Sequence, residues 1–293
     1  IVVTDDAGRY VLPDLPLARY SIWVRGYGLV DSKKIVARPG KQLDLRAVIA
    51  PSERAAAQYY PAIHWYSMMK IPGAGEFGQA GSMIPPRMTQ ADWLRGMKSN
   101  GCVGCHQLGQ LATRTFTPTF HKSLGRFDSP LAFWTRRIQS GQAGGQMVNQ
   151  MMNQMGGAPL RYLADWTDRI AKGELPHTPP QRPQGVERNI VVTLWDWMDE
   201  KHYLHDLIAS DRRDPTVNGW GPLYGSPEYS SDTIPILDPR THRVTSYTLP
   251  VRDPGMPLSL GPGHAADLDP LQPSPYWGSE RIWTTRANNH NSM

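Results

Sequence analysis

Cys102-Val103-Gly104-Cys105-His106 is the stretch around which the rest of the sequence is best interpreted. Its two thiols stand three positions apart, and a histidine directly follows the second. Each thiol can add across one vinyl group of a porphyrin, and the histidine then reaches the iron from one face. The chain contains two cysteines in all, so neither thiol has another partner in the sequence. The pattern predicts covalent attachment of a c-type haem through Cys102 and Cys105, with His106 as an iron ligand.

Three other uses of this motif stay open at this point. A zinc ribbon requires a second cysteine pair, or two more histidines at finger-like spacing, and the sequence has neither. A thioredoxin-type redox pair requires a βαβ pattern around it, and the histidine would have no role there. A local disulfide bond between Cys102 and Cys105 is also compatible with the sequence.

Composition and charge limit the class of protein. The 293 residues are enough for two or three modest domains. The net charge of +5 is mildly basic, and no Lys/Arg run is dense enough to predict a nucleic-acid partner. This charge fits an acidic redox partner as well as an ordinary solvated surface. No stretch has the roughly 18 consecutive apolar residues of a membrane span, so we expect none.

Residues 1–50 show β-type patterns. Ile1-Val2-Val3 is β-branched. In the next segment, Tyr20, Ile22 and Val24 alternate with Ser21, Trp23 and Arg25, the period of two expected for a half-buried strand. The same alternation recurs at Leu43, Leu45 and Ala47. The segments 6–10 (Asp-Ala-Gly-Arg-Tyr), Leu12-Pro13 and 20–25 (Tyr-Ser-Ile-Trp-Val-Arg) resemble the later strands of a carboxypeptidase regulatory-like domain. That resemblance implies part of a prealbumin-like β-sandwich with a structural or docking role.

Residues 51–87 are predicted to be a linker with one short helix near 51–60, because four prolines interrupt the stretch that follows. Residues 88–175 show helical signals on both sides of the motif. Thr89 can cap a helix that places Trp93 and Met97 on one face. Ser129-Pro130 can begin a second helix, and Pro159 can begin a last one. Its apolar stripe consists of Leu160, Leu163, Thr167, Ile170 and Ala171.

Helix, motif, middle helix and closing aromatic helix together resemble an all-α class I c-type cytochrome. The resemblance implies a methionine as the second axial ligand, several tens of residues past the motif. Four methionines lie in that zone, and we favour Met147 because it follows a glycine-rich run. Met147, Met151 and Met155 at i, i+4, i+8 are equally typical of a core stripe, Met152 is the fourth candidate, and His121 is the rival ligand.

Covalent haem attachment in that class takes place outside the bacterial inner membrane. The resemblance therefore implies a periplasmic or secreted protein, and we expect a secretory signal upstream of Ile1. The chain begins within an expected strand, which favours a fragment of a longer protein.

Residues 176–188 form a Pro-rich linker, and residues 189–293 show strand-like pieces. The strands expected at 189–195, 233–239 and 243–250, the last two joined by an Asp-Pro turn, resemble a blade of a virginiamycin B lyase-like (streptogramin lyase-like) β-propeller. Only the first part of such a propeller fits in this length. The other histidines are more typical of surface residues than of one metal site: His64, His202, His205, His242, His264 and His290.

The sequence thus predicts a multidomain α+β protein that transfers electrons through a covalently bound haem. The electrons would pass to a redox partner protein or to an active site on the propeller. The alternative is an accessory haem domain of an enzyme, a dehydrogenase or a lyase, whose active site lies in the missing part of the propeller. A haem module with an open sixth position, used for binding or sensing, is a third possibility. No enzyme activity can be assigned from the residues present.

Overall fold

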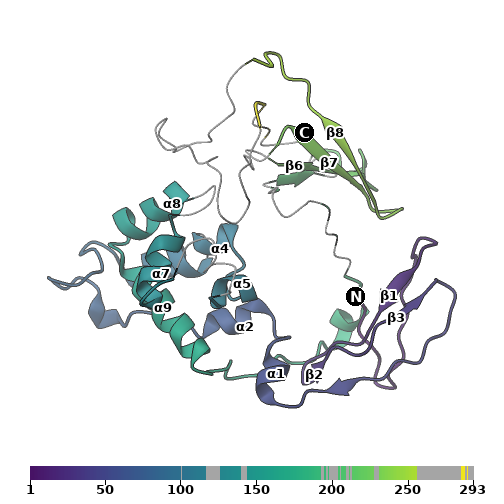
Figure 1. The fold of residues 1–293 in the computed structure, drawn as a ribbon, viewed down its shortest axis with the longest axis horizontal. Helices are drawn as coiled ribbons and strands as arrows, with labels where there is room; N and C mark the ends of the chain where they lie inside the picture. The colour runs from purple at the N-terminus through teal and green to yellow at the C-terminus, as the bar shows by residue number, and fades with distance from the viewer. Residues whose placement is uncertain are drawn as a thin grey trace. The chain divides into compact units, whose positions relative to one another are not determined.

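A computed structural model describes most of the chain (Figure 1). The described residues are 1–99, 101–116, 126–139, 144–192, 195, 197, 204, 206–208, 211, 213–227, 231–255, 285–287 and 289. Helices and small antiparallel sheets are both present, as expected of an α+β protein. The chain divides into two compact units. We name residues 20–182 the helical unit, and residues 1–19 with 183–293 the sheet unit.

The helical unit begins with four short strands and continues with helices. The strands are β1 (Tyr20–Ile22), β2 (Leu29–Val30), β3 (Ile35–Ala37) and β4 (Val48–Ile49). The α-helices are α1 (Glu53–Ala57), α2 (Ala62–Ser67), α3 (Gln90–Leu94), α4 (Cys102–Cys105), α5 (Leu111–Arg114), α7 (Pro130–Arg137), α8 (Gly144–Val148) and α9 (Ala158–Ala171). The 3₁₀-helix η1 (Ala74–Glu76) and the π-helices η2 (Arg95–Ser99) and η3 (Asn149–Gln154) complete it. In the described part of the chain, no helix is both long and apolar enough to cross a membrane.

The helix starts predicted from the sequence are confirmed. Thr89 caps α3, where its hydroxyl accepts from the Asp92 amide at 3.2 Å and the Asp92 carboxylate accepts from the Thr89 amide at 3.0 Å. Ser129 caps α7 in the same way through the Ala132 amide, at 3.1 Å, with proline in the first turn. These contacts satisfy amides that would otherwise lack partners at the start of each helix.

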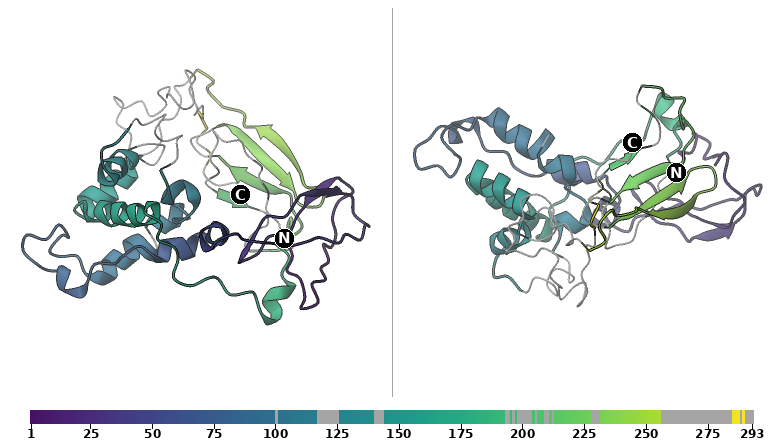
Figure 2. Two further views of the ribbon diagram at one scale, coloured as in Figure 1. Left: turned by 60° about the horizontal axis from the view of Figure 1, so that its bottom comes forward. Right: turned by 90° about the horizontal axis from the view of Figure 1, so that it is seen from above.

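One apolar core holds the helices together. Trp93 and Met97 are fully buried, as their shared helix face predicted. Trp93 packs edge-on against Tyr162 of α9, with ring centroids 5.1 Å apart. Helices α7 and α9 lie side by side in both views of Figure 2. Of the predicted stripe on α9, Leu160, Leu163, Thr167 and Ile170 are buried, whereas Ala171 is exposed.

The segment predicted to be a linker also contributes to this core. Helix α1 lies within the expected short helix, but α2 was not foreseen, and its Trp65 and Tyr66 are almost completely buried. Pro61 does not break α2 because it stands at the N-cap, ahead of the first hydrogen-bonded amides. The apolar pair Trp65-Tyr66 then decides the packing of the segment.

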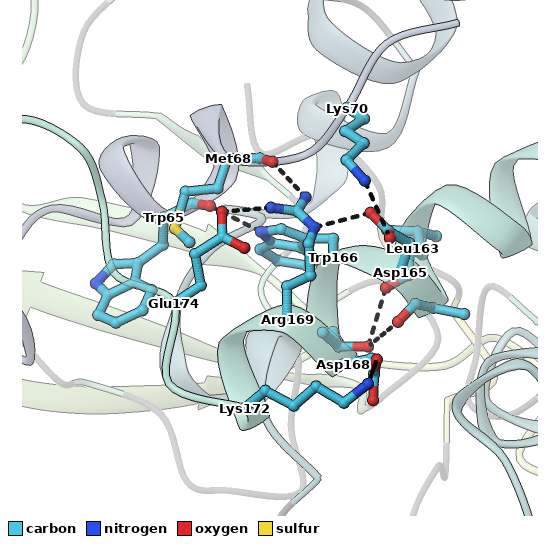
Figure 3. A network of polar contacts seen from close by, with 12 residues as sticks. Trp65, Met68, Lys70, Leu163, Asp165, Trp166, Asp168, Arg169, Lys172 and Glu174 are labelled. Atoms are coloured by element: carbon cyan, nitrogen blue, oxygen red, sulfur yellow. Dashed lines mark hydrogen bonds and ion pairs between the residues drawn. The ribbon is translucent and has the colours of Figure 1, made fainter.

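Side chains of α9 bind the C-terminal end of α2 (Figure 3). The Trp166 indole donates to the Trp65 carbonyl at 2.8 Å, and Arg169 donates to the Met68 carbonyl at 2.6 Å. Arg169 is itself held by Asp165 at 2.8 Å and Glu174 at 2.6 Å. Because the last carbonyls of a helix lack partners within the helix, these donors complete the end of α2.

The β-strands of the helical unit match the sequence in part. Tyr20, Ile22 and Val24 are half-buried while their neighbours are exposed, as the alternation predicted. Strand β1 pairs antiparallel with β3, and β2 pairs with β4. The strand expected around residues 43–47 is not formed, and the chain pairs only at Val48–Ile49.

The sheet unit contains a four-stranded antiparallel meander. Its strands, in sheet order, are β5 (Asp206–Ile208), β6 (Leu223–Ser226), β7 (Thr233–Asp238) and β8 (Arg243–Thr248), preceded by the 3₁₀-helix η4 (Gly185–Asn189). Strands β7 and β8 fall inside the predicted ranges, and Asp238 pairs with Arg243 across the turn. The strands expected at residues 1–3 and 189–192 are absent: Ile1 and Val192 share hydrogen bonds without forming a ladder, and η4 occupies 185–189.

Residues 285–287 are attached to the meander through Asp232. The Asp232 carboxylate accepts from the Thr285 hydroxyl at 2.6 Å and from the Arg286 and Ala287 amides at 2.8 Å. Thr285 is fully buried. A charged acceptor with several donors makes strong hydrogen bonds, so this segment is fixed to the start of β7.

The Trp134–Thr167 hydrogen bond between α7 and α9 gives a test of the helical core. The buried indole donates to the Thr167 hydroxyl at 3.1 Å. Thr167→Val keeps the volume but leaves the indole N–H without an acceptor, so we expect the free energy of unfolding to fall by about 1–3 kcal/mol. Thr135→Val is the matched control on α7, because the half-buried Thr135 hydroxyl only donates to Leu131; its effect should stay within about 0.5 kcal/mol. Urea denaturation measures both free energies of unfolding. Equal losses in Thr167→Val and Thr135→Val would contradict a stabilising role of the Trp134–Thr167 hydrogen bond.

Candidate site around Cys102 and His106

The motif forms one turn of helix followed by an extended residue. Helix α4 spans Cys102–Cys105, and the His106 amide donates to the Cys102 carbonyl at 2.9 Å. His106 itself has φ −125° and ψ 130°, so the chain leaves the helix there. Cys102 is a half-buried thiol with its Sγ 3.8 Å from the Met97 Sδ. The first thiol and the histidine are therefore tied to one turn of backbone.

Helix α2 holds the chain just before the motif. The Tyr66 hydroxyl donates to the Met97 carbonyl, and the Lys98 ammonium donates to the Tyr66 carbonyl at 3.0 Å. Lys98 also lies over the Tyr66 ring, 3.9 Å from its centroid. Burial lowers the pKa of Lys98 to about 8 and raises the pKa of Tyr66. Two side chains thus lock η2 to α2 immediately ahead of Cys102.

Gly109 fixes the chain just after the motif. Its φ of +97° favours glycine, and a Cβ there would overlap the Ala62 carbonyl oxygen and lie 2.9 Å from the Tyr66 amide nitrogen. Its amide donates to the Thr113 hydroxyl at 3.1 Å, and its carbonyl accepts from Arg114 at 2.6 Å. The turn after His106 therefore packs directly on the backbone of α2.

The surroundings of His106 favour the neutral form of its imidazole. The side chain is half-buried, and burial together with the positive charge of Arg137 lowers its pKa. Arg137 donates to the Ala112 carbonyl at 2.8 Å and lies over the Trp134 ring at 5.0 Å. Within the described residues, the His106 ring has no hydrogen-bond partner. A neutral imidazole of this kind is the form that binds metal ions.

The methionines after the motif have different environments. Met151 and Met155 are buried in the core, and the Met155 thioether packs beside Gly96. Met152 has 42% of its surface exposed. Met147 is half-buried and packs against the edge of the core. Of the stripe predicted by the i, i+4, i+8 spacing, Met151 and Met155 are therefore core residues. The rival ligand His121 lies outside the described residues.

The residue types around the motif are those that a covalently bound haem would need. One helical turn and the residue after it carry the half-buried Cys102 thiol and the His106 imidazole, and the half-buried Met147 thioether packs against the edge of the core in the same unit. Helix α4 ends at Cys105, and His106 is its C-cap. Among the described residues, no group of three or more His, Cys, Asp or Glu side chains is arranged to hold a metal ion.

Three residues that shape the site were not identified from the sequence. Tyr66 lies in the segment taken as a linker, and no local pattern connects it to Met97. Arg137 lies on α7, the helix that Ser129-Pro130 predicted, but its electrostatic effect on His106 depends on the packing of that helix. Gly109 had a usable signal, since a glycine shortly after a helical turn is typical of a left-handed conformation.

Replacement of Gly109 tests whether the turn after the motif is held by close packing. Gly109→Ala combines a positive φ with a backbone overlap, so we expect a loss of about 3 kcal/mol or more in unfolding free energy. Gly104→Ala is the matched control, because Gly104 is helical and a Cβ there meets nothing within 4 Å. We expect that variant to keep or slightly raise stability. Chemical denaturation of both variants measures the difference, and a tolerated alanine at 109 would contradict the packing argument.

Comparisons with models of protein families, with curated proteins and with solved structures found no match to this chain. The function of the site must therefore be argued from its own residues.

Proposed function

We propose that this chain transfers electrons through a covalently bound c-type haem. The observation that carries the proposal is the turn from Cys102 to His106, which combines a thiol with a neutral imidazole that no described residue hydrogen-bonds. The C-x-x-C-H sequence and the fixed backbone on both sides of it support the same assignment.

Each residue of the turn has a distinct role under this proposal. Cys102 and Cys105 supply the sulfur atoms of the two thioether bonds, and His106 supplies one iron ligand. When bound, the haem contributes a one-electron redox centre. Burial, and after it the positive charge of Arg137, lowers the pKa of His106, which favours the neutral form of the imidazole that can bind iron.

Met147 is the proposed sixth ligand. Met151 and Met155 fill the core, where movement toward an iron would leave cavities. Met152 is exposed, and a solvent-facing thioether does not shield an iron. Met147 lies in α8 and is half-buried at the edge of the core. Its side chain would therefore lose little packing if it turned toward the haem.

The same proposal includes the architecture and setting inferred from the sequence. The Trp93–Tyr162 contact between α3 and α9 supports a helical arrangement similar to a class I cytochrome. The paired strands before α1 are compatible with part of a β-sandwich. A redox partner and a periplasmic or secreted location follow from the proposed haem chemistry.

A second function is favoured by one observation. The antiparallel meander β5-β6-β7-β8 has the strand order of a single propeller blade. A propeller beyond this blade would carry its own active site. In that case the haem serves as an accessory redox centre of a dehydrogenase or a lyase, and electron transfer through His106 remains the role of the helical unit.

Covalent attachment is the first prediction from this proposal. Protein produced together with a cytochrome maturation system should keep its haem through denaturation and acid-acetone extraction, and its intact mass should increase by one haem. Cys102→Ser should leave a single thioether bond, and the double Cys102→Ser/Cys105→Ser variant should lose its colour on extraction. Gly104→Ala, which leaves all three motif side chains in place, should behave as the original chain. A colourless protein that binds one zinc ion would contradict the proposal.

The sixth ligand is the second prediction. Met147→Ala should abolish the long-wavelength charge-transfer band of thioether-ligated ferric haem, lower the reduction potential and open the iron to carbon monoxide. Met152→Ala is the matched control and should change none of these, because its side chain faces solvent. Met151→Ala and Met155→Ala should retain the band but lose about 2–5 kcal/mol of stability. If His121→Ala removes the low-spin spectrum while Met147→Ala does not, the ligand is His121.

A further inference from the structure

The helical unit contains a cavity of about 300 Å³ between α1, α5 and α9. Among the described residues, its lining includes none of the motif residues 102–106. Two arginines, Arg54 and Arg114, contribute to the lining, and no carboxylate of the described residues does. Trp65, Phe116, Ile170 and Leu175 supply apolar surface. The cavity is therefore positive at one part of its wall, and apolar side chains line the rest together with the polar Gln58, Thr115 and Thr167.

Arg114 is the unusual member of this lining. The residue is only 5% exposed, and its guanidinium donates to the Gly109 carbonyl at 2.6 Å and to the Gln58 side chain at 3.3 Å. A guanidinium has five N–H donors, so most of its capacity is unused in the described part of the chain. It also lies over the Trp65 ring at 4.2 Å, and no described carboxylate pairs with it.

A purely structural role does not account for a full charge here. The contact to Gly109 needs only one donor, which a neutral side chain could provide. Burial of a charge without an opposite charge is costly, and burial lowers the pKa of Arg114 to about 10 with no acidic group opposing the shift. Arg54, exposed at the same cavity, adds a second positive charge and forms no ion pair with a described residue.

We propose that this cavity binds a small organic carboxylate with an apolar body. The carboxylate lies against Arg114 and Arg54, and the body packs on Trp65, Phe116 and Leu175. A planar guanidinium can bind the two oxygens of a carboxylate side by side, which favours this group over a spherical ion. The site uses no residue of the Cys102–His106 motif, so the proposal does not rest on the proposed haem function, although Arg114 also donates to the Gly109 carbonyl after the motif.

Benzoate is a suitable probe, with benzamide as its neutral isostere. We expect isothermal titration calorimetry of the full chain to show one benzoate site and no benzamide binding. Arg114→Lys keeps the positive charge but loses the planar guanidinium, so it should weaken benzoate binding by about 10- to 100-fold. Ala171→Phe adds bulk to the cavity from an exposed position of α9 and keeps both arginines in the chain, and it should abolish binding. Arg161→Gln, an exposed charge of α9 outside the cavity, is the matched control and should leave the affinity unchanged.

Several outcomes would overturn the proposal. Equal affinity in Ala171→Phe would show that benzoate binds elsewhere, and absence of binding to the original chain would show that Arg114 is only a clamp for Gly109. Benzoate binding to haem-free protein that disappears once haem is attached would assign Arg114 to a haem propionate instead. A change in the haem spectrum on adding benzoate would place the ligand at the iron. Binding at one site with an unchanged spectrum supports the cavity.

Discussion

The satisfied C-terminal end of α2 is the constraint on which the helical unit depends. A helix of six residues has little stability of its own, and its last carbonyls have no partners within it. Trp166 and Arg169 of α9 supply those partners, and Tyr66 packs edge-on against Trp166 with centroids 5.8 Å apart. Because α2 is fixed in this way, its Tyr66 hydroxyl can bind the Met97 carbonyl before the motif. Gly109, which follows the motif, packs against the backbone of α2. The geometry of the motif is thus connected to α9, which follows it by more than fifty residues.

Cations on aromatic faces are a second property of the unit. Lys98, Arg114 and Arg137 are each partly or wholly buried, and each lies over a tyrosine or tryptophan ring. A ring face partly compensates a desolvated cation without neutralising it, so positive charge remains inside the unit. Burial lowers the pKa of all three groups for the same reason. Under the proposed function, positive charge near a haem favours the reduced iron, because reduction removes one positive charge from the centre.

The sequence predicted best those features that depend on local chemistry. The caps at Thr89 and Ser129, the alternation at Tyr20–Val24 and the β7–β8 hairpin follow from the nearest few residues, and each is confirmed. The four side chains proposed to hold the haem, Cys102, Cys105, His106 and Met147, were also inferred from the sequence, and their roles stay predictions. Helix α2 was missed because prolines dominated the local signal, whereas its stability comes from Trp65 and Tyr66 packing against distant helices. The strand expected at residues 43–47 does not form, although its alternation is regular, because alternation does not supply a pairing partner: pairing with β2 begins only at Val48.

The turn from Cys102 to His106 is held by contacts on both of its sides. Every contact described here that fixes the turn from Cys102 to His106 comes from the chain itself: the Tyr66 and Lys98 contacts precede it, and the Gly109, Thr113 and Arg114 contacts follow it. A turn fixed by the protein reduces the conformational entropy that ligand binding must overcome. Met147 has no comparable fixation, since it lies at the edge of the core rather than within it. If the chain holds a haem as proposed, His106 would offer its imidazole from a backbone turn that the protein fixes, and Met147 would offer its thioether from the edge of the core.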